Sequence, residues 1–132
     1  MTQNKSNHLP PEQSKKLPIH IDTEYVWIRI NKKWELSSYK SLDAYIKLGM
    51  SNKLLPAPTL EEMLRSCPKF INAEQYDYDH SIILSMEFFN GEFGLGYPGV
   101  QFLYHKDPKQ AVDQMLHWLF KNDYLKELTN AK

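Results

Sequence analysis

The clearest alternation of apolar and polar residues runs from Ser81 to His105. Asn90-Gly91 is typical of a two-residue type I′ hairpin turn, and Pro98-Gly99 of a tight turn of type II. Counting outward from two-residue turns gives an apolar or aromatic pair at every second position, which predicts a three-stranded antiparallel meander. The predicted core-facing pairs are Phe88 with Phe93, Met86 with Leu95, Leu84 with Tyr97, Tyr97 with Val100, Leu95 with Phe102 and Phe93 with Tyr104.

A helix follows the meander. Asp107 is a typical N-cap, Pro108 suits the first helical position, and Gln110 completes a capping box of the Asx type. Apolar residues then recur at helical spacing as far as about Asn122. They are Ala111, Val112, Met115, Leu116 and Leu119. We expect this helix to cover the apolar face of the meander.

The β-branched and aromatic run from Tyr25 to Ile30 predicts a strand, and Trp34-Glu35-Leu36 predicts its hairpin partner. A three-residue loop over Asn31-Lys32-Lys33 would set Ile30 opposite Trp34, Arg29 opposite Glu35 and Ile28 opposite Leu36. This register offers two apolar pairs and one opposite-charge pair. The hairpin is expected to extend the meander.

Two shorter helices are predicted between these strands. Ser41 can cap a helix over 42–48 that ends at Gly49. After Pro56 and Pro58, which favour an extended link, Thr59 and Glu62 form a capping box for a helix that ends before Pro68. Leu60, Met63, Leu64 and Cys67 share one face of that helix, so Cys67 is expected to be buried.

Residues 1–18 are polar, contain Pro10, Pro11 and Pro18, and show no periodic apolar pattern. Such a segment predicts a flexible tail, either without a role or acting as a partner-binding arm. Residues 19–132 then form one α+β domain, in which the antiparallel meander packs against two or three α-helices.

Composition narrows the function classes. The chain has 132 residues and one cysteine, which excludes a disulfide scaffold and a cysteine-based zinc site. The 16 Lys and Arg balance 16 Asp and Glu, and only Arg29 and Arg65 are arginine, so nucleic-acid binding is not expected. Neither a membrane-spanning run nor a signal peptide is recognisable, so a cytoplasmic location is expected.

The second face of the meander is the candidate binding surface. Gly94 and Gly96 leave a strip without side chains, and glycine within a strand often marks the close approach of a ligand or another backbone. Local twist or a bulge beside the Pro-Gly turn is the alternative. The residues assigned to this surface are Glu87, Phe89, Gly94, Gly96, Gln101, Leu103 and His105.

Other reactive groups form no recognised motif. The segment Tyr76–His80 holds two carboxylates and an imidazole but lacks calcium-loop spacing, and a solvated turn that starts a strand explains it better than a cation site or acid–base work. Asp113 and His117 share a helical face, which suits a solvent-side ion pair better than a metal site. Cys67 is expected to pack in the core instead of serving as a nucleophile. No catalytic residue, metal or cofactor is therefore assigned.

Two segments of the sequence are similar to segments of other small proteins. PAPTLEEML at 56–64, followed by Pro68, and AVDQMLHWL at 111–119, followed by Asn122-Asp123-Tyr124-Leu125, resemble small uncharacterised proteins of phages and prophages. The resemblance spans roughly residues 47–126. It implies a phage-type cytoplasmic α+β domain and carries no activity or catalytic residues with it.

The leading functional hypothesis is a non-enzymatic interaction protein that binds an unknown protein partner or itself. The alternative is a small ligand-binding or enzymatic domain that uses Tyr76–His80 or the strand face near Glu87 and His105. A third hypothesis is a nucleic-acid accessory protein with a patch of Lys15, Lys16, Lys32 and Lys33.

Overall fold

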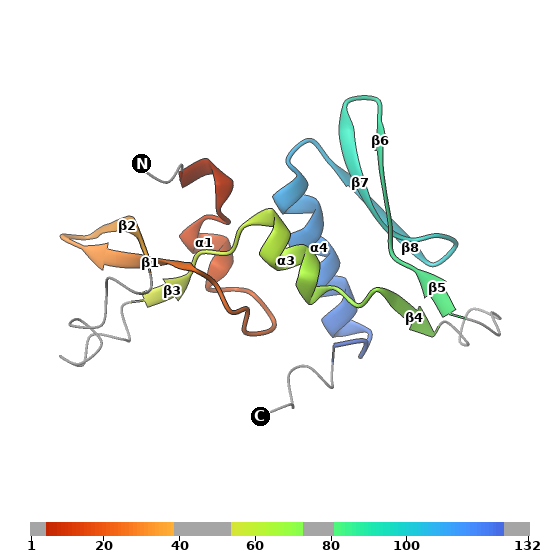
Figure 1. Ribbon diagram of the computed structural model, residues 1–132, viewed down its shortest axis with the longest axis horizontal. Coiled ribbons are helices and arrows are strands. Elements are labelled where there is room, and N and C mark those ends of the chain that lie inside the picture. The colour runs from red at the N-terminus through yellow and green to blue at the C-terminus, as the bar shows by residue number, and fades with distance from the viewer. Residues whose placement is uncertain (1–4, 39–53, 73–80, 126–132) are drawn as a thin grey trace.

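In the part of the chain that the structure describes, helices occupy the middle of the molecule and a three-stranded sheet lies towards each end (Figure 1). The computed structural model describes residues 5–38, 54–72 and 81–125. The predicted helix over 42–48 and the segment Tyr76–His80 lie outside these residues. The described elements are a 3₁₀ helix (Lys5–Asn7), α1 (Pro11–Ser14), β1 (Tyr25–Ile30), β2 (Lys33–Ser38), β3 (Leu54–Pro56), α3 (Leu60–Ser66), β4 (Phe70–Asn72), β5 (Ser81–Ile83), β6 (Ser85–Phe89), β7 (Glu92–Tyr97), β8 (Gln101–His105) and α4 (Pro108–Lys121).

The α+β class and the meander are confirmed. The strands β6, β7 and β8 form an antiparallel sheet in that order, and α4 packs against β7 and β8. Leu95 and Tyr97 of β7 are fully buried together with Met115 and Leu116 of α4. The main core therefore lies between this sheet and the helices.

The predicted strand pairing is correct at the first turn of the meander and wrong at the second. Asn90 and Gly91 both have positive φ, and the predicted pairing of Phe88 with Phe93 is confirmed. At the second turn Val100 N donates to Tyr97 O at 2.9 Å and Gly99 has φ +82°, as a type II turn requires. Pairing nevertheless resumes one residue later than predicted, with Tyr97 opposite Gln101. A type II turn splays the strands it joins, so the β8 register that assumed a two-residue loop is wrong.

That one-residue difference exchanges the two faces of β8. Leu103 now pairs with Leu95 on the side covered by α4, whereas Phe102 pairs with Gly96 and Tyr104 with Gly94 on the other side. Phe102 and Tyr104 therefore do not belong to the core-facing row to which the alternation assigned them.

The N-terminal hairpin exists, but its register and its place differ from the prediction. Asn31 and Lys32 have φ of 51° and 67° and form a two-residue turn, so Ile30 pairs with Lys33 and Arg29 with Trp34. The hairpin does not extend the meander. Instead, β1 lies between β2 and β3 in a separate sheet, because Leu54–Pro56 pairs with its free edge.

The helix α3 begins as predicted. Thr59 Oγ1 accepts from Glu62 N at 3.3 Å, and Thr59 N donates to Glu62 Oε1 at 2.9 Å, so both halves of the capping box are present. Cys67, at the C-cap, is buried in the main core. The expected packing role of Cys67 is thus confirmed.

Residues 5–18 are not the flexible tail that their composition predicts. Leu9 is fully buried in the main core, and Leu9 N donates to Pro58 O at 2.9 Å. His8 Nδ1 lies 2.6 Å from Ala57 O, and Ser14 Oγ donates to Pro56 O at 2.5 Å. The extended Pro-Ala-Pro segment thus offers a row of carbonyl groups on which the N-terminal segment docks, and these bonds offset its ordering entropy.

Candidate functional site

The seven residues assigned to a binding surface do not share one face of the sheet. Glu87, Phe89, Gly94 and Gly96 lie on the side of β6 and β7 that faces away from α4. The shifted register turns the remaining three towards the other side. These three are Gln101, Leu103 and His105. The surface predicted as one continuous patch is therefore divided by the sheet.

The glycine strip is filled by the protein itself. A Cβ atom on Gly94 would lie 2.5 Å from Tyr104 Cε1 and 2.8 Å from Phe102 Cε1. A Cβ atom on Gly96 would meet the backbone of Gln101 and Phe102. Pairing runs through both glycines without a break, so a bulge does not explain them. At Gly96 the structure therefore shows the close approach of another backbone, which was one of the two predicted alternatives, whereas at Gly94 glycine lets aromatic rings of β8 lie across β7.

A side-chain hydrogen bond above Gly94 also connects the two outer strands, β6 and β8. Tyr104 Oη of β8 donates to Glu87 Oε2 of β6 at 2.6 Å, across the middle strand. This hydrogen bond to the Glu87 carboxylate raises the pKa of Tyr104, because the phenol must stay protonated to donate. The Glu87 side chain is thus directed over its own sheet.

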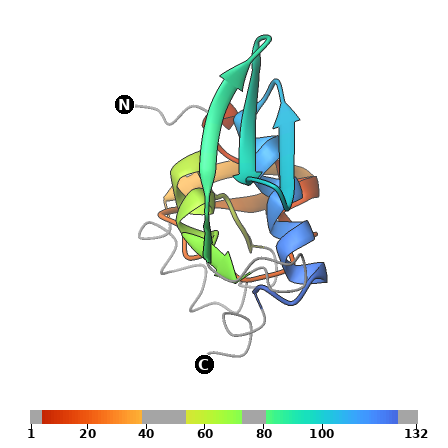
Figure 2. The same ribbon diagram turned by 90° about the vertical axis from the view of Figure 1, so that its right-hand side faces the viewer.

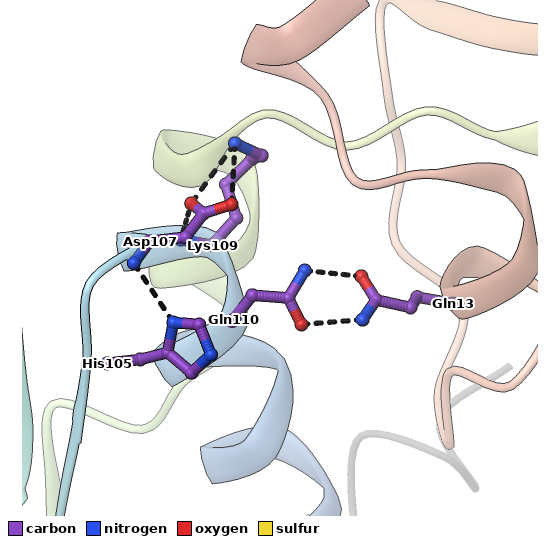
Figure 3. Close-up of polar contacts among 5 residues, drawn as sticks. All are labelled: Gln13, His105, Asp107, Lys109 and Gln110. Carbon is purple, nitrogen blue, oxygen red and sulfur yellow. Dashed lines mark hydrogen bonds and ion pairs between the residues drawn. The ribbon is translucent and has the colours of Figure 1, made fainter.

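His105 supports the start of α4. His105 Nδ1 accepts from Asp107 N at 3.0 Å, while the Asp107 carboxylate accepts from Lys109 N at 3.0 Å (Figure 3). The predicted capping role of Gln110 is wrong. Its side-chain amide instead forms two hydrogen bonds of 2.5 Å with that of Gln13 in α1. His105 therefore accepts the hydrogen bond from the N-cap amide of Asp107 that the side chain of Gln110 was expected to accept.

The enzymatic alternative required a carboxylate and a histidine to converge, either within Tyr76–His80, which lies outside the described residues, or on the strand face near Glu87 and His105. Glu87 contacts Tyr104 on one side of the sheet, whereas His105 contacts Asp107 at the end of β8 on the other side. Cys67 also lacks nucleophilic character, since burial raises its pKa to about 12 and keeps it a thiol. The strand-face residues therefore do not form an acid–base pair.

Asp113 and His117 do lie together on α4, with Nε2 and Oδ1 3.5 Å apart. The predicted solvent-side location is wrong for the carboxylate, which is buried, and burial raises the pKa of Asp113. No group of three or more His, Cys, Asp or Glu side chains within 5–38, 54–72 and 81–125 is arranged to hold a metal ion.

An exposed apolar edge is the feature that the alternation missed. Met86, Phe88 and Phe89 of β6 are 55%, 77% and 61% exposed. The alternation placed Met86 and Phe88 in the core, and this is wrong because α4 covers β7 and β8 and leaves β6 beyond it. Figure 2 shows the β6–β7 hairpin projecting from the body. We call Met86, Phe88 and Phe89 the β6 edge.

The sequence carried a signal for this edge. Phe88 and Phe89 are adjacent, so one of them must leave the core whichever face is buried. A strand that presents large apolar residues on both faces is either enclosed or exposed at an edge, and one helix can enclose only one face.

Comparison with protein families, with curated proteins and with solved structures finds no match for this chain. Among the described helices, none has the length and apolar character needed to cross a membrane.

Proposed function

We propose that this chain is a small non-enzymatic interaction protein of phage or prophage type, which acts in the cytoplasm and binds its partner through the β6 edge. The observation that carries the proposal is the exposure of Met86, Phe88 and Phe89 on one outer strand. The phage-type part of the proposal draws on the PAPTLEEML and AVDQMLHWL segments.

An outer strand with exposed apolar side chains makes a monomeric protein prone to association with other chains. Natural edges are blunted by lysine, proline, bulges or a covering segment, because a free strand edge otherwise pairs with other chains. The strand Ser85–Phe89 contains neither lysine nor proline, and its pairing with β7 is regular. Large apolar side chains gathered on such an edge mark a contact surface.

Two further exposed apolar residues lie on the strands that precede β6 in the fold. Phe70 and Ile83 face each other on the paired strands β4 and β5, and both are exposed. The strand β5 leads into β6 through Leu84 alone. Exposed apolar side chains are thus present on β4 and β5 as well as on β6.

Photo-crosslinking at single positions tests this proposal. A photoreactive phenylalanine analogue replaces Phe88 in cells that naturally produce the protein, and the matched control carries it at Phe120, which is also exposed but lies on α4. We expect adducts from position 88, whether with a second copy or with another protein, and far fewer from position 120.

Equal adduct yields at the two positions, or none at either, would overturn the proposal. The Phe88→Lys variant, crosslinked from Phe89, serves as a second control. Its charge should reduce the yield while leaving the fold intact, because position 88 is already exposed.

A further inference from the structure

We propose that the partner of the β6 edge is a second copy of this chain, whose β6 pairs antiparallel with the first around a twofold axis at Glu87. This inference rests on the proposed interaction function and names its partner.

The backbone of β6 determines which groups are free. Phe89 and Glu92 close the two-residue hairpin turn, and the closing pair of such a turn exchanges two hydrogen bonds. Peptide groups alternate in direction along a strand, so those of Ser85, Glu87 and Phe89 point towards β7. The N–H and C=O groups of Met86 and Phe88 therefore point outward.

Both ends of this free edge are bounded. On one side Leu84 N donates to Lys69 O at 2.7 Å, so the outer edge is already occupied there by the residue preceding β4. On the other side the chain turns away at Asn90, whose φ is 51°. Among the described residues, no strand pairs with the outer edge between these limits.

Only one symmetric register uses the whole edge. A twofold axis perpendicular to the sheet must pass through a residue position, since directly opposite residues point to the same face. An axis at Glu87 pairs Met86 with Phe88 of the second copy and Phe88 with Met86, so both outward residues exchange bonds and four hydrogen bonds form. An axis at Met86 meets Leu84, and one at Phe88 requires Asn90, which lies in the turn.

The same register brings apolar side chains together. Met86 and Phe88 of the two copies form one apolar row on the face that α4 covers over β7 and β8. Phe89 of each copy lies opposite Ser85 on the other face. The pairing joins two three-stranded sheets into one of six strands, which removes the free edge from both copies.

Charge does not oppose this arrangement. The chain carries no net charge at pH 7, so two copies do not repel each other as a whole. Glu87 would lie opposite itself at the axis, where like charges are unfavourable. Its carboxylate, however, is held by Tyr104 Oη on the far strand of its own sheet and is thus directed away from the axis.

Cysteine scanning under mild oxidation tests the register. Glu87→Cys places two thiols directly opposite each other at the axis, within the distance range of a disulfide. Phe88→Cys and Phe89→Cys are the matched controls, since each lies opposite a different residue of the second copy. Cys67 is buried and identical in all three variants. We expect the disulfide-linked dimer to form at least about tenfold faster at position 87 than at 88 or 89.

Sedimentation of the full chain provides the second measurement. We expect a concentration-dependent dimer, weakened at least about tenfold by Phe88→Lys, which sets two lysines near one another. Glu87→Gln should strengthen it. A wild-type chain that stays monomeric, or crosslinking that favours position 88 or 89, overturns this inference. If position 88 still yields photo-adducts with another protein, the interaction function stands and only the second copy is refuted.

Discussion

The hairpins β1–β2 and β6–β7 share a turn geometry and differ in what surrounds them. Each has two consecutive residues of positive φ at its tip. The outer strand β2 carries Lys33 and Glu35, and Lys5 Nζ lies 3.1 Å from Glu35 Oε2. The outer strand β6 instead carries the exposed residues of the β6 edge. The turn sets the local geometry of a hairpin, but the composition of its outer strand decides whether the edge is closed to other chains.

The buried side of each hairpin differs as well. In the first hairpin Trp27 is 4% exposed, and its Nε1 donates to Leu9 O at 2.7 Å. In the second hairpin the large residues of β7 are buried while those of β6 are not. The first hairpin therefore stabilises the monomer through its central strand, whereas β6 contributes little to the stability of a single copy.

The largest effect should come from Trp27→Ala. Removal of this buried ring and of its hydrogen bond should lower the free energy of unfolding by about 3–5 kcal/mol. Phe88→Ala, at an exposed position, should lower it by less than about 1 kcal/mol at dilute concentrations where the chain is monomeric. Urea denaturation measures both. Equal losses would abolish the distinction between the two hairpins.

Gly94→Ala tests whether β7 carries the stability of the second hairpin. The added methyl group must displace the Tyr104 ring, so we expect a loss of about 1–3 kcal/mol, measured in the same way. In a Tyr104→Ala background the same substitution should cost much less, because the obstructing ring is gone. An undiminished cost there would show that the ring is not the reason for glycine at this position.

The turns can be compared by exchanging their second residues. Lys32 and Gly91 both have positive φ, which suits glycine and strains lysine. Lys32→Gly should stabilise the chain by about 0.5–1 kcal/mol, and Gly91→Lys should destabilise it by about 1–2 kcal/mol. Thermal unfolding of both variants reports the signs. If both changes acted in the same direction, the shared turn geometry would be refuted.

The smallest expected effect is a titration shift within the second hairpin. The Glu87 carboxylate raises the pKa of Tyr104 by accepting its hydrogen bond. Glu87→Gln should lower this pKa towards the ordinary tyrosine value, because the neutral amide favours the phenol less over the phenolate. An NMR titration of the Tyr104 ring measures the change. An unchanged pKa would mean that the carboxylate is not held across Gly94.

Local signals in the sequence were sufficient where one turn or cap decides the structure. Asn90-Gly91 determined the pairing of β6 with β7, and Thr59 with Glu62 determined the start of α3. The register failed at Pro98-Gly99 because the type II turn splays its strands, and at Asn31-Lys32 because lysine adopts a conformation that its side chain disfavours.

The candidate site was harder to predict because it depends on what covers each strand. The alternation showed that β6 is apolar, but the reach of α4 across the sheet is a tertiary property. The docking of Leu9 on Pro58 could not be predicted from the sequence for a similar reason, since a single buried leucine in a polar segment produces no periodic signal. The strip at Gly94 and Gly96 was predicted from the sequence. Which residues of β8 lie over it depended on a one-residue difference in the register of that strand.

The hydrogen bonds between Gln13 and Gln110 have a consequence for the order of folding. They join residues 97 positions apart, so this contact of the N-terminal segment forms only after α4 has been synthesised. The hydrogen bonds to the carbonyl groups of 56–58 do not involve α4, but until α4 is present Leu9 has no completed core to enter. During synthesis on a ribosome the core around Leu9 is therefore completed only once both distant segments are present, which favours cooperative assembly.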